Sequence, residues 1–127
     1  MWAHDAHNNL GLALAQQGQL EEAARHFRQA LSLRPMSAGT RSNLGLLLAR
    51  QGRMAEALQQ LGEAVQLDPG NAGNRNNFGV MLVRIGRFDE AMVQFREALT
   101  IDPGLREAQV NLDDPVARSQ RAAPRSR

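Results

Sequence analysis

The chain has 127 residues, enough for one domain with a core of its own. Apolar residues make up 43% of it but aromatic residues only 4%, which favours helices packed through Ala, Leu and Gly over a β-sandwich. The absence of Cys excludes disulfides, thiolate metal sites and cysteine nucleophiles. No segment is apolar enough for a membrane span, and Met1–Asp5 does not begin a secretory signal. We therefore expect a cytoplasmic protein that makes no membrane contact.

The formal net charge of +2 is unevenly distributed along the chain. The chain has no Lys, so all of its basic side chains other than His are Arg. Residues 1–114 carry eleven Arg against thirteen Asp and Glu, whereas residues 115–127 carry four Arg and no acidic residue. We do not expect a nucleic-acid partner, because the body is nearly neutral and a short tail without aromatic residues would bind weakly. Residues 115–127 lack apolar periodicity, which predicts a disordered basic tail.

A 34-residue repeat organises most of the chain. Asn-Leu-Gly at 9–11 recurs as Asn-Leu-Gly at 43–45 and as Asn-Phe-Gly at 77–79, and the second and third units agree at half of their positions. These matches predict three units, over residues 4–37, 38–71 and 72–105.

Each unit begins with a predicted helix. In the first unit Leu10, Gly11 and Leu14 lie on one helical stripe. N-caps are expected where a short polar side chain can accept a free amide hydrogen of the first turn: Asp5, Ser37 and Asn71. The helix would end at a glycine that tolerates positive φ: Gly18, Gly52 and Gly86.

A second helix follows in each unit. In the first unit it carries Ala23, Phe27 and Ala30 at helical spacing, and Pro35 closes the unit because proline cannot donate the helical hydrogen bond. Equivalent prolines close the other units: Pro69 and Pro103. We expect Gly11 to lie opposite Ala23, so that the paired helices approach closely.

Residues 106–114 are predicted to form a truncated helix that caps the third unit, and the Asp114-Pro115 pair would stop it. Because two turns cover little surface, part of the helix carrying Met92, Phe95 and Leu99 is expected to stay accessible. The accessible part of this helix and Trp2 near the amino terminus could bind each other in neighbouring copies of the chain, which would give end-to-end self-association. Docking on another protein or continuation in a longer array are the alternatives.

These features resemble the tetratricopeptide repeat: the 34-residue period, Leu-Gly in the first helix, the Ala-x-x-x-Phe of residues 23–27 and 91–95, and the closing proline. The resemblance covers roughly residues 4–105. It implies an all-α fold, an α-solenoid (right-handed superhelix) of three helix-turn-helix repeats with a short partial fourth helix. One departure is a column where the family often has an aromatic residue: His7, Arg41 and Arg75. This variant looks like the repeats of O-linked N-acetylglucosamine transferases and of bacterial repeat proteins.

Little in the chain points to catalysis, and we expect neither an enzyme nor a cofactor. His4, Asp5 and His7 could share a helix turn, but without a further ligand they are interpreted as a solvated helix end rather than a metal site. His26 is interpreted as a surface residue. A carboxylate recurs at the start of each second helix, as expected of solvated residues there: Glu22, Glu56 and Glu90.

Binding is the more informative possibility, since the resemblance implies that first helices line a concave wall. One face of these helices would supply three rows of residues across the units: Asn9, Asn43 and Asn77; Leu12, Leu46 and Val80; Gln16, Arg50 and Arg84. An Asn amide both donates and accepts, so the Asn row would hold the backbone of an extended peptide, similar to the asparagine ladder of the O-linked N-acetylglucosamine transferases. The apolar row would accept side chains, and the two Arg would favour an acidic feature. The alternatives are that the Asn residues bond a neighbouring helix and that the Arg residues are ordinary surface residues.

We therefore predict a protein-interaction module, a scaffold or adaptor, that binds an extended segment of a protein or peptide partner. A self-assembling scaffold and a targeting fragment of a larger glycosyltransferase-like protein are the alternatives. Repeat domains that bind the acidic C-terminus of heat-shock chaperones use a Lys, Asn, Asn, Lys, Arg set. The corresponding positions match only at Asn43: Asn8, Leu12, Asn43, Gly73 and Asn77. A chaperone tail of that kind is not expected.

Overall fold

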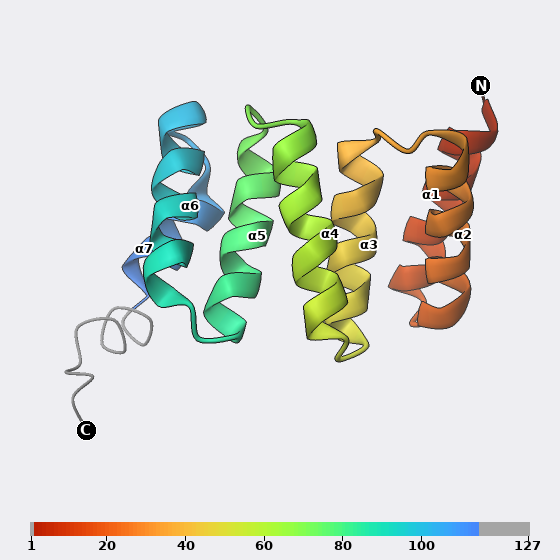
Figure 1. Ribbon diagram of the computed structural model, residues 1–127, viewed down its shortest axis with the longest axis horizontal. Coiled ribbons are helices and arrows are strands. Elements are labelled where there is room, and N and C mark those ends of the chain that lie inside the picture. Colours follow the sequence, from red (N-terminus) through yellow and green to blue (C-terminus); the bar gives the residue numbers. More distant parts are fainter. Residues whose placement is uncertain (1, 115–127) are drawn as a thin grey trace. The chain divides into compact units, whose positions relative to one another are not determined.

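The computed structural model describes residues 2–114, and this part of the chain consists of seven helices without a strand (Figure 1). The helices are α1 (Trp2–Gln16), α2 (Leu20–Leu33), α3 (Ala38–Arg50), α4 (Met54–Leu67), α5 (Ala72–Arg84), α6 (Phe88–Ile101) and α7 (Arg106–Asp113). The chain divides into two compact units, a first over residues 1–68 with α1–α4 and a second from residue 69 with α5–α7. The prediction of an all-α fold of helical repeats is confirmed. Residues 115–127, the predicted disordered tail, lie outside the described residues.

Within the first unit, α1 packs against α2 and α3 against α4, and α2 and α3 join the two hairpins (Figure 1). Within the second unit, α5 packs against α6, and α7 packs on both. The first and second helices of each hairpin are separated by a short turn whose glycine has positive φ, as predicted: 80° at Gly18, 80° at Gly52 and 85° at Gly86.

The hydrogen bonds of these turns explain why glycine recurs there. In the first hairpin, the amide of Gly18 donates to Ala15 O (3.0 Å) and the amide of Gln19 donates back to Leu14 O (2.9 Å). The second bond recurs in the other hairpins, from Arg53 to Leu48 O (2.9 Å) and from Arg87 to Leu82 O (2.8 Å). This pattern satisfies the last carbonyls of the helix and needs a left-handed residue at the turn, which glycine adopts without a Cβ penalty.

Two of the three predicted N-caps are confirmed. The Ser37 side chain accepts from the Thr40 amide at the start of α3, and the Asn71 side chain accepts from the Asn74 amide at the start of α5. The prediction is wrong for Asp5, because α1 begins earlier, at Trp2, and Asp5 lies inside its first turn. There its carboxylate accepts from His4 Nδ1 at 3.0 Å.

Close packing inside the hairpins depends on a glycine in each first helix, and the large side chain one turn beyond the predicted alanine lies nearest to it. A methyl carbon added to Gly11 would lie 2.6 Å from Cε1 of Phe27, and one added to Gly79 would lie 2.5 Å from the same atom of Phe95. The nearest partner of Gly11 is therefore the ring of Phe27, one turn beyond the expected Ala23, and this ring fills the space above the glycine. In the second hairpin a carbon added to Gly45 would lie 2.7 Å from Leu61 Cγ and 3.2 Å from the carbonyl oxygen of Ala57, the residue equivalent to Ala23.

The helix α7 caps the second unit better than its length suggests. Ala108 of α7 is fully buried against Ala72 and Ala98, with Leu99 and Leu105 packed around them. Met92 and Phe95 of α6 are 1% and 0% exposed and Leu99 is half-buried, so the part of this helix that stays accessible, as expected, lies elsewhere, at Val93 and Ile101. Eight residues suffice because a small Ala side chain lets α7 lie close to its neighbours.

Candidate functional site

An apolar pocket opens between α1 and α3 in the first unit. Its volume is about 260 Å³, and its lining comes from three helices: Leu12, Ala15 and Gln16 of α1, Phe27 of α2, and Asn43, Leu46, Leu47 and Arg50 of α3. Phe27 and Leu47 are almost fully buried, whereas Leu12 and Leu46 are 39% and 38% exposed. The pocket thus has an apolar floor, with partly exposed leucines in its lining.

Two polar side chains of this pocket are held by hydrogen bonds to α1. Asn43 Nδ2 donates to Asn8 Oδ1 (3.1 Å), and Arg50 Nη1 donates to the carbonyl of Ala15 (3.1 Å) near the end of α1. The alternative that an Asn of this column bonds a neighbouring helix is therefore confirmed for Asn43. One amide hydrogen of Asn43 is committed, while its Oδ1 accepts no bond from residues 2–114, so the side chain keeps capacity for a ligand.

Asn8, the partner of Asn43, belongs to a further polar network. Its Oδ1 also accepts from Thr40 Oγ1 (3.1 Å), which in turn contacts His4 Nε2 (3.1 Å). Thr40 is 1% exposed and His4 is 7% exposed, so the network is buried between α1 and α3. The interpretation of His4 as part of a solvated helix end is wrong, because its second nitrogen meets a buried hydroxyl. The hydrogen bond from His4 lowers the pKa of Asp5, and the nearby Arg34 acts in the same direction.

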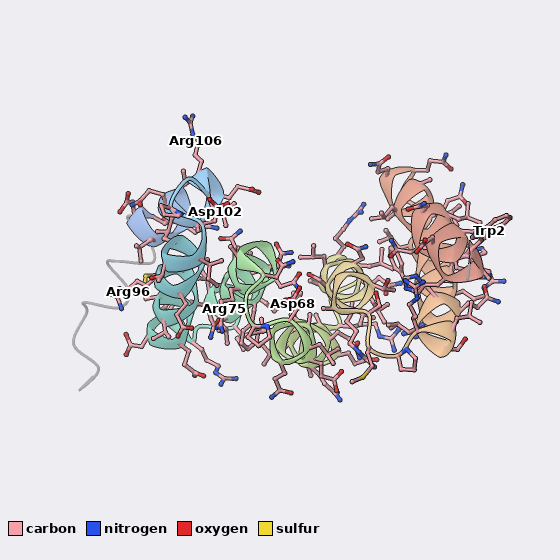
Figure 2. All side chains as sticks on the ribbon, turned by 90° about the horizontal axis from the view of Figure 1, so that it is seen from above. Trp2, Asp68, Arg75, Arg96, Asp102 and Arg106 are labelled. Carbon is pink, nitrogen blue, oxygen red and sulfur yellow. The ribbon has the colours of Figure 1, made fainter. Side chains whose placement is uncertain are left out.

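A second pocket of about 420 Å³ lies between α5 and α7 in the second unit. It is lined by Asn76, Asn77 and Val80 of α5 and by Arg106, Glu107, Val110 and Asn111 of α7. Asn111 Nδ2 donates to Asn76 Oδ1 (3.0 Å), which repeats the Asn43–Asn8 bond two 34-residue repeats later. Sequence reasoning missed Asn8, Asn76 and Asn111 as partners, although the 34-residue period places Asn111 in the Asn column. The side chain of Arg106 extends away from α7 (Figure 2).

The predicted binding residues divide between the two pockets. Four lie together in the first: Leu12, Asn43, Leu46 and Arg50. Two lie in the second: Asn77 and Val80. Asn9 and Arg84 are exposed, on α1 and in the last turn of α5, and neither lines either of these two pockets. The continuation of the three rows from one unit to the other stays a prediction.

The residues at the position where the family often has an aromatic residue, His7, Arg41 and Arg75, join the two helices of their hairpins. Arg41 donates from Nε to Pro35 O (3.1 Å) and from Nη1 to Gln60 (3.0 Å). Arg75 makes the same pair of bonds one unit later, to Pro69 O (2.9 Å) and Gln94 (3.1 Å). Each guanidinium thus joins the turn before its own helix to the second helix.

In the first hairpin two imidazoles occupy the corresponding places. His7 Nδ1 lies 3.0 Å from His26 Nδ1, and both rings are half-buried. The interpretation of His26 as a plain surface residue is therefore wrong. Its partner comes from the other helix of the hairpin, which periodicity within one helix does not reveal.

The repeated carboxylates at the starts of the second helices are exposed, as expected. Glu56 pairs with Arg53, and Glu90 pairs with Arg87, in each case across one helical turn. The hydrogen bond from Arg87 lowers the pKa of Glu90. Within residues 2–114, no group of three or more His, Asp or Glu side chains could hold a metal ion together. None of the helices in this range is long and apolar enough to cross a bilayer.

Two models of the tetratricopeptide repeat match this sequence, over residues 8–72 and residues 48–109, and the first alone spans half of the chain. The chain belongs to the tetratricopeptide repeat family. No curated protein matches it significantly.

Solved structures of other tetratricopeptide repeat proteins have the same fold. The first such domain of Spaghetti, solved with an HSP90 peptide, matches with a TM-score of 0.88 at 18% identity, over 96% of this chain and 95% of that one. The Sgt2 domain from Aspergillus fumigatus matches with a TM-score of 0.85 at 16% identity, over 92% and 78%. A mutant O-GlcNAc transferase from Thermobaculum terrenum matches with a TM-score of 0.82 at 26% identity, over 87% of this chain but only 21% of the enzyme.

Proposed function

We propose that this tetratricopeptide repeat protein is an interaction module, a scaffold or adaptor, that binds an extended segment of a partner protein. Tetratricopeptide repeats are generally non-catalytic interaction modules, and one structural neighbour was solved with a peptide bound. The observation that carries the proposal is the pocket between α1 and α3, which gathers four of the residues expected to bind a peptide.

The size and chemistry of this pocket suit a peptide side chain. Small-molecule pockets usually measure roughly 300–1,000 Å³, so about 260 Å³ fits one or two side chains better than a whole small ligand. The buried faces of Phe27 and Leu47 favour an apolar side chain. Asn43 Oδ1 would accept a backbone amide hydrogen of the peptide, and Arg50 would favour an acidic neighbour because most of its donors stay exposed.

The remaining binding residues belong to the same proposal. Asn9 and Asn77 would contribute backbone contacts, Leu12 and Val80 would contact apolar side chains, and Arg84 would add a second basic group. The cytoplasmic location stays a prediction. The 18%-identical neighbour carries no evidence for a chaperone-tail ligand here, and only Asn43 matches the residue set that such domains use.

Selection from a random peptide library on the full chain tests this function. Leu46→Arg places a charge in the pocket and is tolerated by the fold because Leu46 is 38% exposed. Leu33→Arg is the matched control, since Leu33 is 53% exposed at the end of α2 and lines neither pocket. Selected peptides should bind wild type and Leu33→Arg alike, and bind Leu46→Arg at least about tenfold more weakly, a loss of about 1.4 kcal/mol. Equal binding to all three proteins would contradict the site.

The Asn row requires a separate variant. Replacing Asn9, Asn43 and Asn77 together by Ala should weaken every selected peptide regardless of its sequence, because backbone contacts are lost. If the circular dichroism spectrum is unchanged and the affinities are too, the Asn residues are structural only.

A self-assembling scaffold remains the second candidate function, supported by one end of the chain. Trp2 is 82% exposed and its side chain extends away from the α1–α2 hairpin, and Leu10 on the same helix is 45% exposed (Figure 2). The burial of Met92 and Phe95 removes support from the other end. Light scattering coupled to size exclusion tests this candidate: a concentration-dependent mass that Trp2→Ser abolishes would favour it. The third candidate, a targeting fragment of a larger enzyme, depends only on the likeness to the transferase repeats.

A further inference from the structure

The first hairpin contains a pair of histidines that the peptide site does not use. His7 on α1 and His26 on α2 point their Nδ1 atoms at each other, 3.0 Å apart. Their ring centroids are 5.2 Å apart and the ring planes are inclined by 26°, so the two rings meet edge to edge through these nitrogens. Neither Nε2 atom has a hydrogen-bond partner among residues 2–114.

The equivalent positions of the other hairpins show what the repeat needs there. Gln60 accepts from Arg41 at 3.0 Å, and Gln94 accepts from Arg75 at 3.1 Å. An Arg–Gln pair therefore satisfies the structural requirement for joining the two helices. The first hairpin instead carries two groups that are, when neutral, among the commonest metal ligands in proteins.

We propose that His7 and His26 chelate a late divalent transition metal, with copper(II) preferred, through their two Nδ1 atoms. With imidazole nitrogens about 2.0–2.1 Å from a metal, a separation of 3.0 Å corresponds to a nitrogen–metal–nitrogen angle of about 95°. That angle is close to the right angle between neighbouring ligands in square-planar and octahedral complexes. A tetrahedral ion such as zinc would require about 3.3 Å between the nitrogens at the same bond lengths.

The ring protons permit this binding without a new base. In the metal-free pair one Nδ1 donates its hydrogen to the other, so each neutral ring carries one proton. When the metal binds, the donating ring changes tautomer and carries its proton on Nε2, as the other ring already does. Both Nδ1 lone pairs are then available, each ring turns so that its lone pair points to the shared metal rather than to the other ring, and no net proton is lost.

The rest of the coordination shell is open to water or to a ligand from another molecule. His4 lies one turn from His7 on α1, but it is not a third ligand, because Asp5 and Thr40 contact its two nitrogens. Copper(II) binds nitrogen sites most tightly of the first-row divalent ions and favours tetragonal geometry. The bound ion would cross-link α1 to α2 and stabilise the folded first hairpin.

Copper(II) titrated into the full, tag-free chain tests the site, with binding followed by calorimetry and by electron paramagnetic resonance. The control variant carries His7→Arg and His26→Gln, which recreates the Arg–Gln pair of the other two hairpins and retains His4 and the amino terminus. Wild type should bind one copper(II) with a two-nitrogen signature and show a higher melting temperature in its presence. Nickel(II) and zinc(II) should each bind more weakly than copper(II).

The control should fold, as judged by circular dichroism, and lose both the saturable binding and the melting-temperature shift. Equal copper binding by wild type and control, or no saturable binding by wild type, would overturn the proposal. If the control does not fold, imidazole resonances of wild type decide the matter. Copper(II) should broaden those of His7 and His26 before those of His4, and the reverse order would refute the assignment.

Discussion

The contact between Gly79 and Phe95 gives the sharpest test of the packing. A methyl group on Gly79 would lie 2.5, 2.9 and 3.0 Å from three atoms of one rigid ring, and that ring is 0% exposed. The ring cannot yield without disturbing its neighbours, so the overpacking penalty should reach the upper end of the usual range, about 3 kcal/mol. Replacing glycine by alanine inside a helix recovers about 1 kcal/mol. Gly79→Ala should therefore lower the free energy of unfolding by about 2 kcal/mol.

Gly39 provides the matched control. It lies in the first turn of a first helix, α3, and a methyl group there would meet nothing within 4 Å. Gly39→Ala should raise the free energy of unfolding by about 0.5–1 kcal/mol, because only the helix preference changes. The two substitutions are chemically identical and are expected to act in opposite directions.

Urea denaturation of the full chain, followed by circular dichroism, measures both changes. If the dependence of the unfolding free energy on urea concentration has the same slope in both proteins, the difference between their midpoint concentrations multiplied by that slope gives the change in the free energy of unfolding. Thermal melts should agree, at roughly 4 °C per kcal/mol for a domain of this size. A Gly79→Ala protein as stable as wild type would refute the packing argument. Equal destabilisation by both variants would show that the loss of glycine itself, rather than the Phe95 contact, is responsible.

Three further predictions concern single polar contacts. Ser37→Ala removes the side-chain cap of α3 and should cost about 1 kcal/mol in urea denaturation; Ser32→Ala, on the exposed surface of α2, is the control and should change little. Arg75→Lys should lower the free energy of unfolding by about 1 kcal/mol, because a Lys side chain cannot reproduce the planar fork that reaches both Pro69 O and Gln94. A change within error of zero would contradict the role given to Arg75 in joining the two helices. Asp5 has a lowered pKa in the folded chain, so its contribution to stability is present above its unfolded pKa and is lost as the pH falls. Asp5→Asn should therefore reduce the loss of stability below about pH 4 in acid titrations followed by circular dichroism, whereas an unchanged acid profile would show that the contact with His4 has no effect.

Local features of the fold were predictable from the sequence because they depend on residues close together in the chain. The exit glycines at 18, 52 and 86 have positive φ because a turn of fixed length follows each first helix. Ser37 and Asn71 cap helices because each accepts an amide hydrogen three residues away. The repeat period also placed Leu12, Asn43, Leu46 and Arg50 on one side of their helices, and the structure brings these four residues to one pocket.

Contacts between helices were decided by the tertiary structure. Periodicity shows which face of a helix is buried, but the axial offset between two helices decides which side chains meet. This offset placed the ring of Phe27 above Gly11, and it brought His26 to His7. It also let Ala108 of a short helix fill the end of the second unit. Such pairings join residues far apart in sequence, so they follow from how the side-chain volumes pack together and not from the pattern of any one helix.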